Sequence, residues 1–183
     1  MRTLHRLISI MLLLGSLLST CPAFAAGEET DEISRLHRAG NSAQAVQLAD
    51  KVLAARPKDA QVRFLKGVVL AESQRGVEAI EVFQGLTEDF PELAEPYNNL
   101  ATLYAARGDY DRARVALEQA LRSNPGYATA HENLGDVHGM LASRAYARAL
   151  ALEPGNNRLP AKLALARELF AAKQNASAPA SPQ

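Results

Sequence analysis

The 183-residue chain has no tryptophan, a single cysteine and few aromatic residues, which make up 5% of the total. Alanine and leucine dominate its hydrophobic residues and β-branched residues are few, a composition that favours helices over sheets. The 20 basic and 20 acidic residues cancel. The composition therefore predicts an all-α protein of one modest domain, and it implies no nucleic-acid partner.

The N-terminus has the pattern of a secretory signal peptide. Arg2 and Arg6 precede a nearly unbroken apolar run from Leu7 to Leu18, and Ala23-Phe24-Ala25 supplies a small-x-small cleavage site. The run is shorter than the ~20 residues that span a bilayer. We expect residues 1–25 to be a signal peptide that is cleaved after Ala25, so that the protein is exported.

Cys21 leaves a second interpretation of the N-terminus open. Residues 18–21, Leu-Ser-Thr-Cys, resemble a lipobox, in which the cysteine becomes the lipidated first residue. Thr20 and Pro22 fit that pattern poorly, and the cleavage site after Ala25 competes with it. Cleavage after Ala25 would leave a chain without cysteine, and hence without disulfides or thiol chemistry.

An internal repeat of 34 residues runs through the chain. Four prolines follow it with spacings of 34, 34 and 29, and a small residue, an alanine and several larger residues recur in phase with them. These registers include Pro57, Pro91, Pro125 and Pro154; Gly67, Ala101 and Gly135; and Ala45, Ala79, Ala113 and Ala142. The period predicts a series of helical hairpins that must stack to bury their apolar faces.

Each slot has a mechanical reason. A small residue lets the two helices of a hairpin approach closely, and the larger residues one turn away fill the space around that contact. The proline ends the second helix, because it lacks an amide hydrogen and crowds the preceding turn.

Residues 94–127 resemble a tetratricopeptide repeat throughout. The matching residues are Tyr97, Leu100-Ala101, Tyr104, Gly108-Asp109-Tyr110, Ala113, Leu117, Ala120 and Pro125. The resemblance implies a short right-handed solenoid of helical hairpins, with repeats at 60–93 and 94–127. It also implies a degenerate N-terminal repeat with a short first helix at 26–59 and a truncated one at 128–154.

The truncated repeat lacks five residues. His138 is still in register with the upstream repeats, whereas Ala142 is already five residues early, so the deletion removes the turn between the two helices. Residues on both sides of the deletion form one stripe whose mean spacing is about 3.6 residues, the period of an α-helix. The stripe consists of Leu134, His138, Leu141, Ala145, Ala149 and Leu152. We expect a single fused helix over 128–152, bent at Gly139 if anywhere, which would terminate the groove of the solenoid.

The C-terminal part reads as a loop, a helix and a tail. Pro154-Gly155-Asn156-Asn157 has loop composition. Residues 158–174 then have an apolar side that predicts a capping helix, and the Ala/Ser/Pro-rich residues 175–183 are expected to be disordered.

No pattern of a catalytic nucleophile, metal site or phosphate loop occurs, so we expect no enzyme activity, no cofactor and no metal. His131-Glu132 would need a second histidine at 135 for a zinc-protease helix, and Gly135 stands there. His131 and His138 occupy the repeat slots of Tyr97 and Tyr104, so we expect them to pack inward.

The resemblance implies that the first helices line a concave groove that binds a protein or peptide. The groove positions carried over from the family are Gln61, Phe64, Val68, Glu95, Asn98, Asn99, Thr102, Glu132, Asn133 and Asp136. Asn99 and Asn133 either bond a ligand backbone or brace the neighbouring helix. Because these positions are apolar, amide or acidic, we expect a partner segment with an apolar anchor and basic residues.

The expected function is a non-catalytic interaction scaffold or assembly factor in the bacterial periplasm. The alternative is an outer-membrane lipoprotein, lipidated on Cys21, that aids assembly of a pilus or envelope complex. In that case alone would a membrane be a partner. A third interpretation is an accessory to an enzyme. Self-association through an open solenoid end remains compatible with the sequence.

Overall fold

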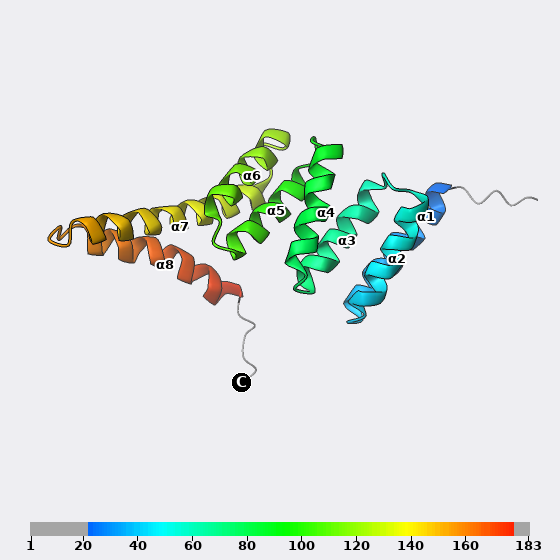
Figure 1. Cartoon of the computed structure of the whole chain (residues 1–183), viewed down its shortest axis with the longest axis horizontal. Helices are drawn as coiled ribbons and strands as arrows, with labels where there is room; N and C mark the ends of the chain where they lie inside the picture. Colours follow the sequence, from blue (N-terminus) through cyan, green and yellow to red (C-terminus); the bar gives the residue numbers. More distant parts are fainter. Residues whose placement is uncertain (1–21, 178–183) are drawn as a thin grey trace, which may run out of the picture.

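The computed structural model describes the backbone of residues 22–177 and the side chains of residues 27–169. Within this part the chain folds into eight α-helices and no strand, in agreement with the all-α expectation (Figure 1). The helices are α1 Pro22–Arg38, α2 Ser42–Ala55, α3 Ala60–Glu72, α4 Gly76–Asp89, α5 Ala94–Ala106, α6 Tyr110–Ser123, α7 Ala128–Leu152 and α8 Leu159–Ser177.

Three hairpins, α1–α2, α3–α4 and α5–α6, stack into a solenoid that α7 continues (Figure 1). The first helices α1, α3, α5 and α7 contact one another in sequence. Each second helix also packs against the first helix of the next unit. This is the stacked-hairpin architecture that the 34-residue period predicted.

The turn inside each hairpin depends on one residue in the left-handed region. Gly40 (φ 80°), Gln74 (φ 62°) and Gly108 (φ 75°) are 34 residues apart. The next amide closes each turn onto the preceding helix, as when the Arg75 amide donates to the Leu70 carbonyl at 2.9 Å. Glycine adopts this conformation without strain, and Gln74 does so at a cost.

Close helix approach inside the second hairpin depends on Gly67. A Cβ atom at Gly67 would lie 2.7 Å from the ring of Phe83, which is fully buried. Ala101 is also buried in the corresponding slot of α5. The small-residue slot therefore has its expected role in these two hairpins.

The first hairpin is more complete than the sequence suggested. α1 has 17 residues, against 13 in α3, so the expectation of a short first helix was wrong. Thr30 and Ile33 are buried against the rest of the hairpin. The expected cleavage after Ala25 falls within α1 and would leave residues 26–38 as the first helix. Residues 1–21, with Cys21 and most of the expected signal peptide, lie outside the described residues.

α7 is one uninterrupted helix of 25 residues, which confirms the fused helix expected from the deletion. It begins in the register of α3 and α5. It ends in the register of α2, α4 and α6, because the Glu153 amide donates to the Ala149 carbonyl as Asn124 does to Ala120. Gly139 is buried on α7, where Leu169 and Ala166 of α8 approach to about 4 Å.

The fusion changes the surroundings of three residues, and the expectations for them were wrong. His131 and His138 are exposed rather than packed inward. Gly135 is exposed as well, with no atom within 4 Å of a Cβ placed there. At Gly135 and His138 no second helix folds back, because α7 continues straight on, and a ring nitrogen of His131 lies 2.9 Å from the Pro125 carbonyl oxygen.

α8 packs along α7 and contacts no other helix within the described chain (Figure 1). It buries Leu163 and Ala166 against α7. α8 runs to Ser177, past the start of the tail expected at residue 175, and residues 178–183 lie outside the described chain. None of the described helices is long and apolar enough to cross a membrane.

Candidate partner-binding groove

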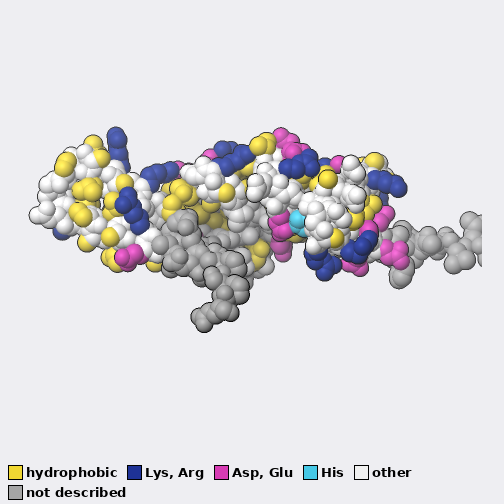
Figure 2. All heavy atoms as spheres, turned by 90° about the horizontal axis from the view of Figure 1, so that it is seen from below, with side chains coloured by type: hydrophobic (Ala, Val, Ile, Leu, Met, Phe, Trp, Pro, Cys, Tyr) yellow, Lys and Arg dark blue, Asp and Glu magenta, His cyan; other side chains and the backbone are white. Residues whose placement is uncertain are grey.

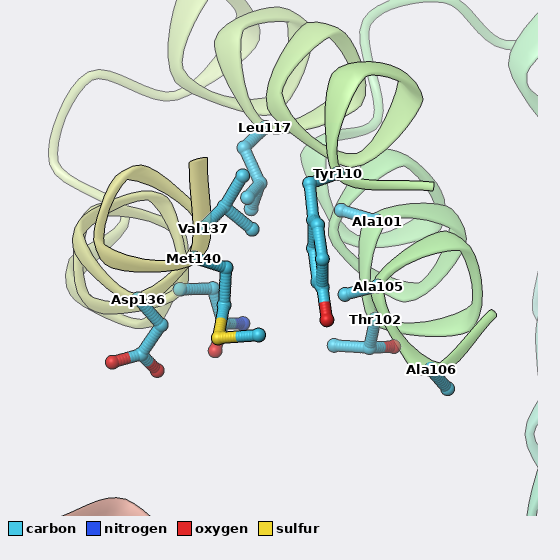
Figure 3. Close-up of a pocket in the computed structure, with 10 residues that line it drawn as sticks. Ala101, Thr102, Ala105, Ala106, Tyr110, Leu117, Asp136, Val137 and Met140 are labelled. Carbon is cyan, nitrogen blue, oxygen red and sulfur yellow. The ribbon is translucent and has the colours of Figure 1, made fainter. Parts of the chain in front are cut away.

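A cleft of about 310 Å³ lies where α5, α6 and α7 meet (Figure 3). Its walls are mostly apolar, with a few polar groups among them. It is lined by Ala101, Thr102, Ala105, Ala106, Tyr110, Leu117, Asn133, Asp136, Val137 and Met140.

Small residues on α5 and large ones on α6 and α7 create this cleft. Figure 3 shows the ring of Tyr110 standing between Ala101 and Ala105 on one side and Val137 and Met140 on the other. The Tyr110 hydroxyl points to the same side as the Met140 thioether. An apolar side chain entering the cleft would contact an aromatic face and a flexible thioether, both adaptable surfaces for binding.

A second apolar cleft, of about 360 Å³, lies between α3 and α5. It is lined by Ala60, Gln61, Phe64, Leu93, Glu95 and Pro96. The Phe64 ring is half-buried, and its centroid lies 5.7 Å from that of Phe83 in a tilted arrangement. Packing against Phe83 fixes Phe64, which leaves its outer face as a rigid part of the cleft wall.

An amide pair ties α5 to α7 between the two clefts. The Asn133 Nδ2 group donates to Asn98 Oδ1 at 2.9 Å, and Asn98 is only 7% exposed. Asn133 thus braces the neighbouring helix, one of the two roles left open for it. The amide of Asn99 instead donates to the Glu95 carbonyl of its own helix.

The structure brings six of the ten proposed groove residues to these clefts. Thr102, Asn133 and Asp136 line the α5–α7 cleft, whereas Gln61, Phe64 and Glu95 line the α3–α5 cleft. Of the other four, Glu132 is exposed, Val68 and Asn99 are half-buried, and Asn98 is buried.

The repeat pattern did not point to Tyr110, Leu117, Val137 and Met140 as groove residues. Tyr110 and Leu117 belong to α6, a second helix that the pattern assigns to the outer side. Their signal was the Gly-Asp-Tyr turn, which places an aromatic ring at the start of α6 and within reach of α7.

The groove is acidic as well as apolar. Glu95, Glu132 and Asp136 are its charged members, and among the side chains that the structure describes no lysine or arginine lines either cleft. Burial and the nearby Glu95 carboxylate raise the pKa of the Tyr127 hydroxyl at the base of α7. In the part of the chain that is described, no three His, Cys, Asp or Glu side chains are grouped so as to hold a metal ion.

Comparisons with known sequences agree with this architecture. A "Tetratricopeptide repeat" family model matches residues 30–94 and a "TPR repeat" model matches residues 101–141, together more than half of the chain. The second match stops at the point where α7 runs on instead of turning.

The chain is similar to parts of longer proteins. It is 33% identical over 84 residues, 43% of its length, to a tetratricopeptide repeat domain-containing chloroplast protein, PYG7, of Arabidopsis thaliana, and covers 27% of that protein. It is 31% identical over 150 residues, 75% of its length, to cellulose synthase operon protein C of Xanthomonas axonopodis pv. citri, and covers 10% of it. The chain thus spans between a tenth and about a quarter of these relatives.

Solved structures with the same fold include a MamA protein, with a TM-score of 0.58 and 24% identity over 82% of this chain and 87% of that one. Another is TTC0263, a tetratricopeptide-repeat protein of Thermus thermophilus, with a TM-score of 0.58 and 23% identity over 80% and 82% of the two chains. At these identities the likeness concerns the fold alone. The family models, which match the stacked hairpins, show that the chain belongs to the tetratricopeptide-repeat family.

Proposed function

We propose that this protein is a non-catalytic scaffold that holds a peptide or a partner protein in the groove formed by α3, α5 and α7. The observation that carries the proposal is the pair of apolar clefts, α3–α5 and α5–α7, on one line of helices with acidic residues around them. Stacked helical repeats commonly use such a concave line of helices as a binding surface.

The groove favours a segment with apolar side chains and positive charges. The α5–α7 cleft is deep enough for one bulky apolar side chain, and Phe64 offers a second apolar contact about one repeat away. Glu95, Glu132 and Asp136 would attract basic residues of the partner. These charges would determine the position at which the partner segment binds more than the strength of its binding.

Relatives of the chain include enzymes by name, such as a probable biofilm formation methyltransferase of Pseudomonas aeruginosa, 35% identical over 51% of this chain. The chain covers 22% of that protein. Our proposal of a scaffold rests on the sequence, which lacks the patterns of a catalytic nucleophile, a phosphate loop or a cysteine pair.

We propose the periplasm as the location. The basic start, the short apolar run and the Ala-Phe-Ala site that precedes Ala26 support export and cleavage. Lipidation at Cys21 is the competing proposal, and it would place the same scaffold on a membrane surface.

Site-specific photocrosslinking in cells tests the groove. Thr102 is exposed at the rim of the α5–α7 cleft, so a crosslinker there faces a bound partner without disturbing the Asn98–Asn133 pair. Val77 on α4 is also exposed and lies in neither cleft, which makes it the matched control. The proposal predicts a specific adduct from Thr102 and none from Val77.

A double variant tests whether the captured partner binds in the groove. Phe64→Ala with Asp136→Lys removes the apolar contact of one cleft and reverses the charge of the other. Capture from Thr102 that is unchanged in this variant would mean that the partner does not bind in the groove.

A further inference from the structure

Charge is divided unevenly along the folded chain. Residues 27–138 carry 12 basic and 18 acidic residues, a net charge of −6, whereas residues 139–177 carry 6 basic and 2 acidic ones, a net charge of +4. The boundary falls at Gly139, where α8 packs against α7. The solenoid body is therefore acidic, and the outer half of α7 together with α8, which we name the C-terminal arm, is basic.

The C-terminal arm also exposes large apolar side chains. Leu152 is 68% exposed, Leu165 63% and Leu169 67%. Lys162, Leu165 and Leu169 follow one another at helical spacing, so they share one flank of α8. Figure 2 shows hydrophobic and basic side chains together over the α7–α8 end of the molecule. A capping helix of a solenoid normally presents a polar outer face, whereas α8 exposes Leu165 and Leu169 among its charged residues.

This flank has the chemistry that the groove favours in a partner. It offers leucines for the apolar clefts and Lys162 for the groove carboxylates of Glu132 and Asp136, and the exposed Arg158, just before the start of α8, adds a second positive charge. We propose that the groove of one copy binds the α8 flank of a second copy. This inference rests on the proposed binding groove and names its occupant.

The structure favours a second copy over the arm of the same chain. Within the described chain α8 contacts α7 alone, and it buries Leu163 and Ala166 there. Lys162 lies over the Tyr146 ring of α7 and Leu169 approaches Gly139, yet Leu165 and Leu169 remain 63% and 67% exposed. To enter its own groove, α8 would have to leave α7 and expose those buried residues.

Charge also disfavours a pairing of two arms with each other. Each arm carries +4, so a symmetric arm-to-arm contact would bring like charges together, whereas arm-to-groove contact joins opposite charges. Such a contact uses two different surfaces of each copy and leaves one of each free at the ends. Repeated from copy to copy, it builds an open head-to-tail chain, or a ring where the rotation between copies closes.

Sedimentation velocity of the full chain, as processed and purified from the exporting cell, tests this assembly. The weight-average sedimentation coefficient is expected to rise with protein concentration at ~50 mM salt and to rise much less at ~500 mM salt, because salt screens charge attraction. Leu165→Ser with Leu169→Ser is expected to weaken association at least tenfold. Val77→Ser, at an exposed apolar residue outside both surfaces, is the control and should leave it unchanged.

Reversing the charges of the arm and of the groove in separate variants tests whether these two surfaces bind each other. Arg158→Glu with Lys162→Glu reverses the arm, and Glu132→Lys with Asp136→Lys reverses the groove. Each double variant alone should remain monomeric, and a mixture of the two should associate again. All four positions are at the surface or half-buried, and circular dichroism checks that each variant is folded.

A wild-type chain that stays monomeric at every concentration overturns the inference. So does association that the groove variant leaves unchanged, because it would show arm-to-arm pairing, and so does a monomer whose leucine flank binds vesicles of anionic phospholipid instead. If the chain is monomeric and the Thr102 crosslinker still captures a different protein, the inference fails while the proposed function stands.

Discussion

Gly67 and Gly135 occupy the same slot two repeats apart, yet alanine at the two positions is expected to change stability in opposite directions. At Gly67 the new Cβ atom would lie 2.7 Å from two ring carbons of Phe83. That is roughly 1 Å inside ordinary carbon contact, and over-packing of a core costs about 1–3 kcal/mol. The higher helix propensity of alanine offsets about 1 kcal/mol of this. The variant Gly67→Ala should therefore be less stable by about 1 kcal/mol or more.

At Gly135 only the propensity gain remains. The residue lies in the interior of α7, is exposed, and has no atom within 4 Å of the added Cβ. Gly135→Ala should therefore stabilise the protein by about 0.8–1 kcal/mol.

Urea unfolding followed by circular dichroism measures both variants, and in thermal unfolding each kcal/mol corresponds to about 2–4 °C for a chain of this size. Phe83→Leu provides the control, because removing the ring should make a second change, Gly67→Ala, nearly neutral in a double-mutant cycle. Destabilisation by Gly135→Ala equal to that by Gly67→Ala would refute the reasoning, since it would mean that a second helix does cover Gly135.

Three further predictions concern other parts of the chain. Gln74→Gly should stabilise the α3–α4 hairpin by about 0.5–1 kcal/mol in urea unfolding, because Gln74 has a φ of 62°, which glycine adopts without strain. The hydrogen bond from the Arg112 side chain, and then that from its backbone amide, lowers the pKa of Asp109. Stability from Asp109 is thus present above its unfolded pKa and lost as pH falls through the folded value, so Arg112→Gln should raise the Asp109 pKa in an NMR titration and start acid unfolding at higher pH. Mass spectrometry of the mature protein should find Ala26 as the first residue. An acylated Cys21 as the first residue would contradict this prediction and indicate a lipid-anchored protein.

Most of the fold can be predicted from the spacing of residues that recur along the sequence. Registers that recur every 34 residues predicted the stacked hairpins. The five-residue jump between His138 and Ala142 predicted the fused α7, because a helix without a turn residue continues. The physical cause is visible at Gly40, Gln74 and Gly108, which supply the left-handed residue of each turn, whereas the deletion removes that position from α7.

The wrong predictions concern residues whose surroundings were inferred from their position in the repeat alone. His131, His138 and Gly135 were assigned the packing of intact repeats, and that packing requires a second helix over α7. Asn98 was assigned to the partner, and only the structure shows that it is buried against Asn133. The burial of a residue depends on which helices pack around it, and its position in the repeat does not specify them. The burial of these residues could therefore not be predicted from the repeat alone.

The deletion links the end of the groove to the arm that we propose as its ligand. α7 has 25 residues and α3 has 13, so at ~1.5 Å per residue α7 reaches about 18 Å further than a first helix of the solenoid. Its outer half therefore leaves the solenoid, and α8 is the one described helix that packs on it (Figure 1). A turn near Gly139 would have folded that segment back as the second helix of an intact repeat and buried its apolar side against α7. Without the turn, the segment continues as part of a basic arm with exposed leucines, and the described part of α8 contacts no helix of the α3–α5 cleft.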